Sequence, residues 1–136
     1  MAPKILLRLM TPYKSVFEDE VEAVILPGEM GEFGILSGHT KFVTTMIPGV
    51  LRYIAQGKTH RFAVSGGFAE VYPGGVTVLA DSMERPEEIE KERAQASRDK
   101  AVEALKDRPK LSETEVFRWE ARLARAENRI KAAKLS

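Results

Sequence analysis

Hydrophobic residues recur at every second position through much of the first 80 residues. Ile5, Leu7 and Leu9 set this pattern, which stops where Thr11-Pro12 introduces a turn. A period of two places alternate side chains on opposite faces of a β-strand, so that one face is buried and the other meets solvent. Similar apolar and β-branched runs predict six more strands, at residues 21–26, 42–46, 50–55, 59–64, 68–72 and 76–80.

Turn-forming residues separate these predicted strands. They are Pro27-Gly28, Pro48-Gly49, Gln56-Gly57, Gly66-Gly67 and Pro73-Gly74-Gly75. Short strands with a turn at intervals of about 8 to 12 residues are typical of a β-sandwich or barrel. We therefore predict an N-terminal antiparallel β-sandwich over residues 1–83.

The periodicity becomes helical after Met83. Pro86, followed by two glutamates, is a helix start, and this first helix is predicted over residues 87–106, before Arg108-Pro109. Ser112 and Glu115 have the spacing of a capping box, which predicts a second helix that ends near Lys134. The short break between the helices favours an antiparallel hairpin. The predicted fold class is thus α+β, with a sandwich over residues 1–83 and a two-helix hairpin over residues 84–136.

Charge is distributed unevenly between these two regions. Residues 84–136 hold 26 charged side chains, against 15 in residues 1–83, although the net charge of the chain is only +1. The predicted hairpin therefore has few large apolar side chains with which to pack, and we expect it to detach readily. A net charge near zero argues against binding to nucleic acid.

Several kinds of site are disfavoured by composition. The chain has no cysteine and two histidines, His39 and His60, which lie in different segments, so a zinc site would need carboxylate ligands. No segment approaches the roughly 20 apolar residues of a membrane-spanning helix, and the N-terminal apolar run is too short for a signal peptide. We expect any membrane association to come through a partner.

The segment from Pro27 to His39 contains four glycines and is the most unusual stretch of the sequence. A phosphate-binding loop would need a following helix and an early lysine, whereas Lys41 comes late and β-branched residues follow. Two interpretations remain open. The segment is either a set of turns that join strands of an antiparallel sheet, or the same turns serve as a docking surface.

Ser65 precedes Gly66-Gly67 and is the one residue that suggests a nucleophile on a sharp turn. A nucleophile elbow requires a strand followed by a helix, and residues 68–72 predict a strand instead. No histidine lies in a recognisable context for a catalytic partner. A turn serine is the better interpretation, and we expect no catalytic site.

Four arginines share one face of the second predicted helix, at spacings of four, three and four residues: Arg118, Arg122, Arg125 and Arg129. One interpretation is a solvated face that pairs with neighbouring glutamates of the same helix, at positions 115, 120 and 127. The other is a binding site for an acidic partner or a phosphate group, for which the guanidinium fork is well suited.

Linked motifs across the chain resemble one known family, the ε subunit of F-type ATP synthase. The motifs are Gly31-Glu32-Phe33-Gly34-Ile35-Leu36-Ser37-Gly38-His39, Pro48-Gly49-Val50, Ser65-Gly66-Gly67-Phe68 and Val76-Thr77-Val78-Leu79-Ala80-Asp81. The resemblance implies a non-catalytic rotor subunit of the central stalk that needs no cofactor. It also implies a peripheral location on the cytoplasmic face of a cell membrane, or on the stromal face of a thylakoid if the chain is plastid-encoded.

The resemblance further implies where partners bind. The loop of residues 29–39 matches the end that docks on the rotor, formed by the c-ring and the γ subunit. The residues implied to dock are Glu29, Met30, Glu32 and His39, with Glu32 the leading candidate for a c-ring contact and His39 for the γ side. The C-terminal hairpin, when it extends along γ, would inhibit ATP hydrolysis. Its arginine face would then lie near an acidic segment of the β subunit, with α close by.

Some bacterial relatives bind ATP on the folded hairpin, and the matching stretch here is Ile89-Glu90-Lys91-Glu92-Arg93-Ala94. Glu84, Arg125 and Arg129 occupy matching positions nearby. This family motif has aspartate where the chain has Glu90, whose extra methylene moves the carboxylate by about 1 Å or more, enough to weaken a specific contact. The stretch is therefore either a regulatory ATP site or part of the hairpin's own packing and surface pairing.

Overall fold

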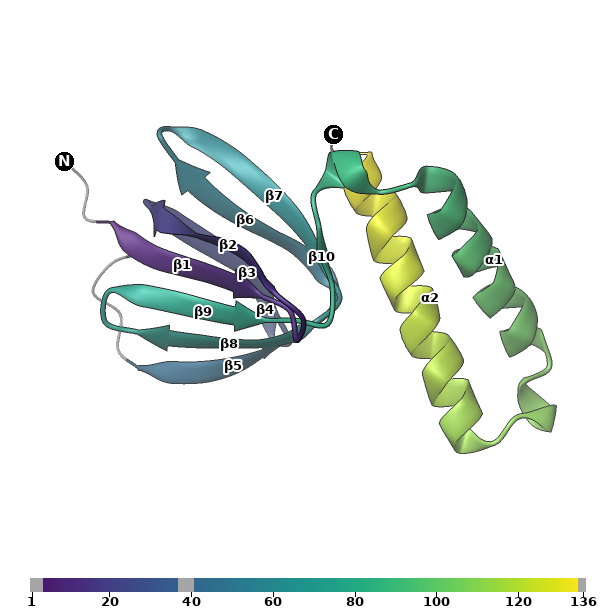
Figure 1. Ribbon diagram of the computed structural model, residues 1–136. Coiled ribbons are helices and arrows are strands. Elements are labelled where there is room, and N and C mark those ends of the chain that lie inside the picture. The colour runs from purple at the N-terminus through teal and green to yellow at the C-terminus, as the bar shows by residue number, and fades with distance from the viewer. Residues whose placement is uncertain (1–3, 37–40, 135–136) are drawn as a thin grey trace. The chain divides into compact units, whose positions relative to one another are not determined.

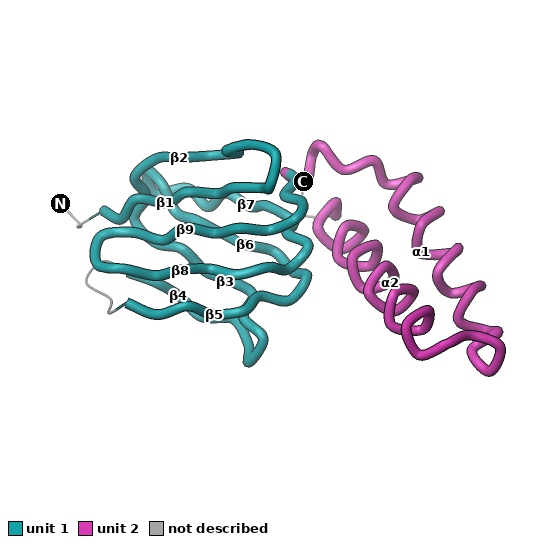
Figure 2. The backbone as a smooth tube through the Cα atoms, turned by 60° about the horizontal axis from the view of Figure 1, so that its bottom comes forward, with its two compact units in different colours: residues 1–84 teal, residues 85–136 magenta. Residues whose placement is uncertain are grey.

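The computed structural model describes residues 4–36 and 41–134. The chain divides into two compact units, Met1–Glu84 and Arg85–Ser136 (Figure 2). The described part of the first unit is built of β-strands and that of the second of helices. The predicted α+β fold class, a β-sandwich followed by a helical hairpin, is confirmed.

The first unit contains ten strands in its described part. In chain order they are β1 (Ile5–Met10), β2 (Ser15–Val21), β3 (Ala23–Gly28), β4 (Gly31–Ile35), β5 (Phe42–Met46), β6 (Gly49–Ala55), β7 (Lys58–Val64), β8 (Gly67–Tyr72), β9 (Gly75–Leu79) and β10 (Met83–Glu84). Neighbours follow the order β10-β7-β6-β3-β5-β8-β9-β1-β2, and β4 pairs with β3. β1 and β9 run parallel, whereas the other described pairs are antiparallel. This folded sheet forms two facing layers (Figure 1).

The core of the sandwich follows the alternation seen in the sequence. Leu7 and Leu9 on β1 have no exposed surface, and they pair with Val76 and Val78 on β9, which are equally buried. Burial of one such side chain contributes about 1.5 to 3 kcal/mol to stability. The prediction that alternate residues of these strands form the core is confirmed.

Three strands were not among those predicted from the sequence: β2, β4 and β10. β2 is rich in acidic residues and lies at one end of the strand order, where charge protects an edge against pairing with other chains. β10 is only two residues long and lies at the opposite end. Neither strand carries the apolar alternation by which the others are recognised.

The predicted strand end at Pro27-Gly28 is wrong. β3 runs through Gly28, and the chain then reverses at Glu29-Met30 into β4, with Gly28 paired to Gly31. A Cβ atom on Gly28 would lie 2.7 Å from the Phe33 ring, and Gly31 has a φ of +121°. The glycines therefore serve a tight β-hairpin, which agrees with the interpretation of this segment as turns between strands.

Ser65 is a turn residue that is hydrogen-bonded to Ser82, in the segment between β9 and β10. Its hydroxyl oxygen accepts a hydrogen bond from the backbone N–H of Ser82 at 3.0 Å, and its own N–H donates to the Ser82 carbonyl at 3.2 Å. The adjacent Gly67 has a φ of +127°, and a Cβ atom there would overlap the Leu79 carbonyl oxygen. This arrangement agrees with the turn interpretation of Ser65.

The second unit contains the helices α1 (Lys91–Lys106) and α2 (Glu113–Ala133), with 3₁₀ turns η1 (Pro86–Glu88) and η2 (Arg108–Lys110). The predicted start of the first helix near residue 87 is wrong. Pro86 begins only the η1 turn, because Ile89 and Glu90 return to extended backbone before α1 begins. The predicted capping box is confirmed: the Glu115 N–H donates to the Ser112 hydroxyl at 3.1 Å, and the Ser112 N–H donates to the Glu115 carboxylate at 3.2 Å.

The hairpin buries little apolar surface. Among the described residues of this unit, the buried hydrophobic side chains are Ile89 and five alanines: Ala94, Ala101, Ala126, Ala132 and Ala133. A buried methyl group contributes only about 0.8 kcal/mol, against about 1.5 to 3 for a leucine or valine. The expected scarcity of large apolar side chains in the packing of the hairpin is thus observed.

Candidate docking surfaces

The β3–β4 hairpin presents three of the four residues predicted to dock on the rotor. Met30 at its tip is 99% exposed, and Glu29 and Glu32 are exposed on either side of it. The N–H of Glu29 donates to the Thr45 carbonyl at 3.1 Å, which ties the tip to β5. The fourth predicted residue, His39, lies outside the described residues. The hairpin tip is therefore an apolar side chain flanked by two acidic residues, all open to solvent.

Glu32 is held by an arginine that sequence reasoning did not single out. A terminal nitrogen of Arg52 lies 3.0 Å from the Glu32 Oε1 atom, and the side chains are 34% and 58% exposed. Arg52 lies on β6 and Glu32 on β4, and both strands pair with β3. The ion pair therefore orients the carboxylate. The two residues are 20 positions apart, so no local motif revealed the contact.

An exposed apolar row crosses the opposite layer of the sandwich. Phe68 on β8 pairs with Leu79 on β9, which pairs with Met10 on β1. These side chains are 56%, 38% and 37% exposed, and Val43 on β5 is 69% exposed. We call these four residues the apolar strip. The sequence signal for it is that Phe68, Leu79 and Met10 take the solvent positions of strands whose alternate positions are also apolar.

The stretch that matches the ATP motif is only partly accessible. Ile89 is 6% exposed and Ala94 is fully buried, whereas Glu90 and Arg93 are exposed. A hollow of about 390 Å³ adjoins the stretch, and its lining includes Glu87, Glu90 and Glu92 with a single lysine, Lys91. Three carboxylates against one ammonium group disfavour a triphosphate in this hollow.

The remaining residues assigned to an ATP site are divided between the two units. Glu84 lies on β10 of the first unit, whereas Arg125 and Arg129 lie on α2 of the second. Arg125 is exposed and Arg129 is partly buried. Within the second unit, the hollow beside Glu90 is lined by neither of these arginines.

Three of the four arginines on this face of α2 are not paired with the glutamates of their own helix. Glu120 pairs instead with Arg108 at 3.0 Å, and Glu115 is engaged in the capping box. Arg118, Arg122 and Arg125 form no ion pair with any residue that the structure describes. For these three arginines, the interpretation as intrahelical pairs with glutamates is wrong.

Two aromatic residues flank the arginines. Phe117 is 72% exposed, and the ring centre of Trp119 lies 5.3 Å from the guanidinium carbon of Arg122. A hollow of about 570 Å³ on α2 is lined by Phe117, Arg118, Trp119, Arg122 and Arg125, with Glu115 and Ala121. We call this surface the α2 groove. The arginine spacing was visible in the sequence, whereas the exposure of Phe117 beside the arginines was not.

None of the helices in the described part of the chain is long and apolar enough to span a bilayer. Within the same residues, no group of three or more histidine or acidic side chains is arranged to hold a metal ion.

Both units match known family models. Residues 4–86 match the β-sandwich domain of the ATP synthase delta/epsilon chain, and residues 87–134 match its long α-helix domain. The chain is 46% identical over 127 residues to the ATP synthase epsilon chain of Desulforamulus reducens, which covers 93% of this chain and 95% of that protein. It is 45% identical over 131 residues to the epsilon chain of Desulforapulum autotrophicum, covering 96% of each.

Solved structures of ATP synthases also contain chains with this fold. A chain in the cryo-EM structure of the Euglena gracilis mitochondrial ATP synthase, comprising OSCP, F1 and the c-ring, superposes with a TM-score of 0.82 at 26% identity, covering 100% of this chain and 84% of that one. A chain of the Tetrahymena thermophila central stalk and c-ring gives a TM-score of 0.62 at 11% identity, over 97% and 98% of the two chains, and so shares the fold.

Proposed function

The chain belongs to the delta/epsilon chain family of ATP synthase as a non-catalytic, epsilon-type component of the central stalk, and from this premise we propose that it couples proton flow to ATP synthesis and restrains ATP hydrolysis. In this proposal the sandwich docks on the γ subunit and the c-ring. The helical hairpin acts as the inhibitory element. The complex holds the chain peripherally at the membrane, on the cytoplasmic face in a bacterium or the stromal face of a thylakoid.

The apolar strip is the observation that carries the docking role. Phe68 and Val43 are both more than half exposed. Phe68 lines up with Leu79 and Met10 across neighbouring strands, and Val43 lies on the adjacent strand β5, two residues from the partner of Phe68. A row of large apolar side chains on a sheet face costs solubility unless a partner covers it. The central core of a protein–protein interface is depleted in charged residues and rich in aromatic residues, as this strip is. We assign the γ subunit as the partner that covers it.

The exposed hairpin tip supports a second contact, with the c-ring. Met30 provides an apolar anchor, and Glu29 and Glu32 provide two acceptors for hydrogen-bond donors on the ring. His39, which we assign to the γ side, lies outside the described residues.

The inhibitory role is supported by the open arginine face of α2. Three guanidinium groups without carboxylate partners among the described residues are available to an acidic segment of the β subunit, with α close by when the hairpin extends.

Deletion of residues 85–136 tests the inhibitory role, because β10 and the sandwich core remain intact in that variant. We expect the complex assembled with the truncated chain to hydrolyse ATP several-fold faster than the complete complex. Proton-driven ATP synthesis should be retained, since the docking surfaces of the sandwich are unchanged. Equal hydrolysis rates in the two complexes would show that the hairpin is not a brake in this protein.

A second candidate function is a free-standing ATP-sensing module on the hairpin. It is favoured by the exposure of Arg93 next to the buried Ala94, because Ala94 packs inside the hairpin while the Arg93 side chain is open to a ligand. The carboxylates around Glu90 count against it. Calorimetry of the complete chain with millimolar ATP tests this function. Binding heat that is lost in the Arg93→Ala variant would support it, and the absence of binding heat in the wild type would rule it out.

A further inference from the structure

We propose that the hydrogen bond between Arg122 on α2 and Ser97 on α1 is a latch that holds the two helices together and limits how often the hairpin opens into its inhibitory form. The proposal rests on the inhibitory role assigned above to the hairpin. It adds that a contact within the hairpin itself, through Ser97, controls that role. Because the latch opposes opening, weakening it should make inhibition stronger.

Arg122 differs from its neighbours on the arginine face because its side chain reaches across to α1. Its Nε atom donates to the Ser97 hydroxyl at 3.2 Å, between residues 25 positions apart in the sequence. Its guanidinium carbon lies 5.3 Å from the centre of the Trp119 ring, which holds the group from a second side. Arg122 is accordingly half-buried, whereas Arg118 and Arg125 are exposed. The Arg122 side chain is therefore held between the two helices.

Ser97 lies on the buried alanine face of α1. It comes three residues after Ala94 and four before Ala101, which are both fully buried, and residues at these spacings share one face of a helix. Serine is nearly the size of alanine, so its hydroxyl adds a hydrogen-bond acceptor to this face with little change in packing. The alanines on either side of it offer no such acceptor. Ser97 is therefore the point on this face at which α1 can bind a guanidinium of α2.

The latch has a large share in holding the helices together because the apolar contact between them is small. The buried hydrophobic side chains in the described part of the hairpin are one isoleucine and five alanines. The larger side chains of Val102, Leu105 and Leu123 are half-buried. The stabilisation from burial grows with the apolar area removed from water, and an alanine removes little. A partly buried hydrogen bond from a charged donor is comparable in strength, and its loss should shift the equilibrium toward the open hairpin about tenfold.

A second polar contact reaches α2 from the turn η2, and it restrains the helices less. Arg108 lies 3.0 Å from Glu120, and their side chains are 56% and 49% exposed. Water and salt screen such exposed ion pairs, so they contribute little to stability. Arg108 also lies at the end where the chain joins the two helices, so this pair can persist when the helices separate farther along. Ser97 and Arg122, by contrast, lie near the middle of their helices.

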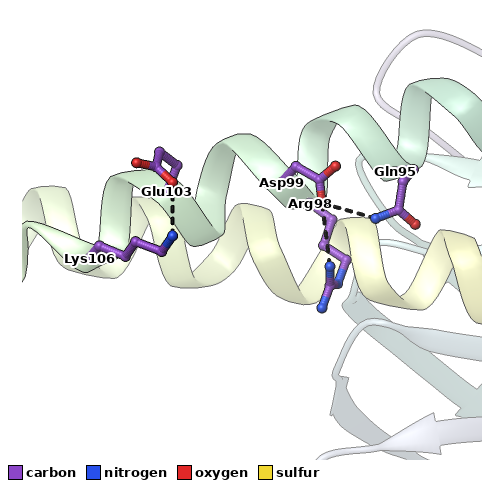
Figure 3. A network of polar contacts seen from close by, with 5 residues as sticks. All are labelled: Gln95, Arg98, Asp99, Glu103 and Lys106. Carbon is purple, nitrogen blue, oxygen red and sulfur yellow. Dashed lines mark hydrogen bonds and ion pairs between the residues drawn. The ribbon is translucent and has the colours of Figure 1, made fainter.

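The polar contacts along α1 survive opening because they lie within α1. Gln95 donates to Asp99 at 3.0 Å, and Arg98 lies 3.4 Å from the same carboxylate (Figure 3). Lys106 lies 3.1 Å from Glu103 in the next turns of the helix. The capping box of α2 is likewise internal to its helix. Opening of the hairpin therefore breaks the latch and leaves intact the contacts that keep each helix folded.

Thiol labelling of the isolated complete chain measures how often the hairpin opens. The chain has no cysteine, so Ala101→Cys introduces a single thiol, at a position with no exposed surface, that a reagent can reach when the helices separate. The labelling rate then follows the open fraction. We expect Ser97→Ala, made in this background, to raise the rate about tenfold. Alanine favours the helix more than serine, so faster labelling cannot come from a weaker α1.

Gln95→Ala is the matched control for the labelling experiment, because it removes a hydrogen bond that lies within α1. We expect it to leave the labelling rate of the Ala101→Cys thiol unchanged. Equal rates in the Ser97→Ala and Gln95→Ala variants would overturn the proposal.

A double-mutant cycle tests whether Arg122 is the partner through which Ser97 acts. In the isolated chain, Arg122→Ala should raise the labelling rate at least as much as Ser97→Ala, since it also removes the contact with Trp119. Once Arg122 is replaced, Ser97→Ala should add nothing. Arg118→Ala, at an exposed position of the same face, should leave the rate unchanged. Additive effects of Ser97→Ala and Arg122→Ala would show that they do not act as one latch.

ATP hydrolysis by the assembled complex tests the regulatory role through its sign. Because Ser97→Ala favours the open hairpin, we expect it to lower residual hydrolysis several-fold, with Gln95→Ala matching the wild type. If deletion of residues 85–136 releases hydrolysis but Ser97→Ala leaves it unchanged or raises it, this inference fails while the inhibitory role stands. If the deletion has no effect, the proposed inhibitory role fails, and the labelling rates decide separately whether the latch holds the hairpin closed.

Discussion

Glu32 and Arg52 form an ion pair of 3.0 Å between β4 and β6, with β3 paired to both strands. The contact ties the exposed hairpin that ends at Met30 to the sheet behind it. It also leaves the second carboxylate oxygen of Glu32 exposed enough to meet a partner, since the side chain is 58% exposed. The surface proposed to meet the c-ring is thus positioned by a residue far from it in sequence.

Arg52→Ala should reduce docking more than it reduces stability. Both side chains are partly exposed, so solvent screens the pair, and its loss should lower the free energy of unfolding by at most about 1 kcal/mol. Coupling, measured as ATP-driven proton pumping by the assembled complex, should fall, because the Glu32 carboxylate is no longer oriented. Lys58→Ala, at the exposed β6–β7 turn, is the control. Equal pumping by both variants would show that Arg52 does not position Glu32.

Phe68→Ser should abolish tight binding to the rotor without unfolding the sandwich. Phe68 is 56% exposed, so its replacement should change the free energy of unfolding by less than about 1 kcal/mol. Co-purification with the γ subunit should be lost, because an aromatic anchor of the apolar strip is missing. Glu70→Gln, a neighbouring exposed position on β8, should co-purify normally. Normal co-purification of Phe68→Ser would show that γ does not cover the strip.

Gly67→Ala should destabilise the sandwich far more than Gly57→Ala. Both glycines have positive φ, +127° and +74°, but only at Gly67 would a Cβ atom overlap backbone, at the Leu79 carbonyl oxygen. We expect a loss of about 1 kcal/mol at Gly57 from conformation alone and a clearly larger loss at Gly67. Urea denaturation of the two variants measures the difference. Similar losses of unfolding free energy in the two variants would show that the backbone at Gly67 and Leu79 shifts at little cost to accommodate the added methyl group.

Ser112→Ala should weaken the hairpin by about 1 kcal/mol, because it removes the hydroxyl that accepts a hydrogen bond from the Glu115 N–H at 3.1 Å. The loss should appear as reduced helicity by circular dichroism and earlier thermal unfolding of the helices. Thr114→Ala, one residue inside the same helix, removes a hydroxyl without touching the cap and should have little effect or raise helicity slightly. If Ser112→Ala leaves both helicity and the unfolding temperature unchanged, packing of α2 is sufficient to stabilise its first turn without the cap.

Local patterns account for what was recognised in advance. The alternation around Leu7 identified β1, and the spacing of Ser112 and Glu115 identified the start of α2, because both signals involve neighbours a few residues apart. The same local reasoning failed at Pro86. That proline begins a single 3₁₀ turn, and extended backbone at Ile89 delays the helix. It also failed to find β4, whose strand character comes from pairing with β3 and not from apolar alternation.

The sequence by itself determined the α+β class, the family, the sandwich core and the arginine face of α2, because periodicity and motif spacing act over short distances along the chain. The tertiary structure alone decided which residues from distant segments meet. It brought Arg52 to Glu32 and aligned Phe68, Leu79 and Met10 in one row. Such neighbours depend on strand order and register, and a shift of one residue would turn each of these side chains to the other face of the sheet.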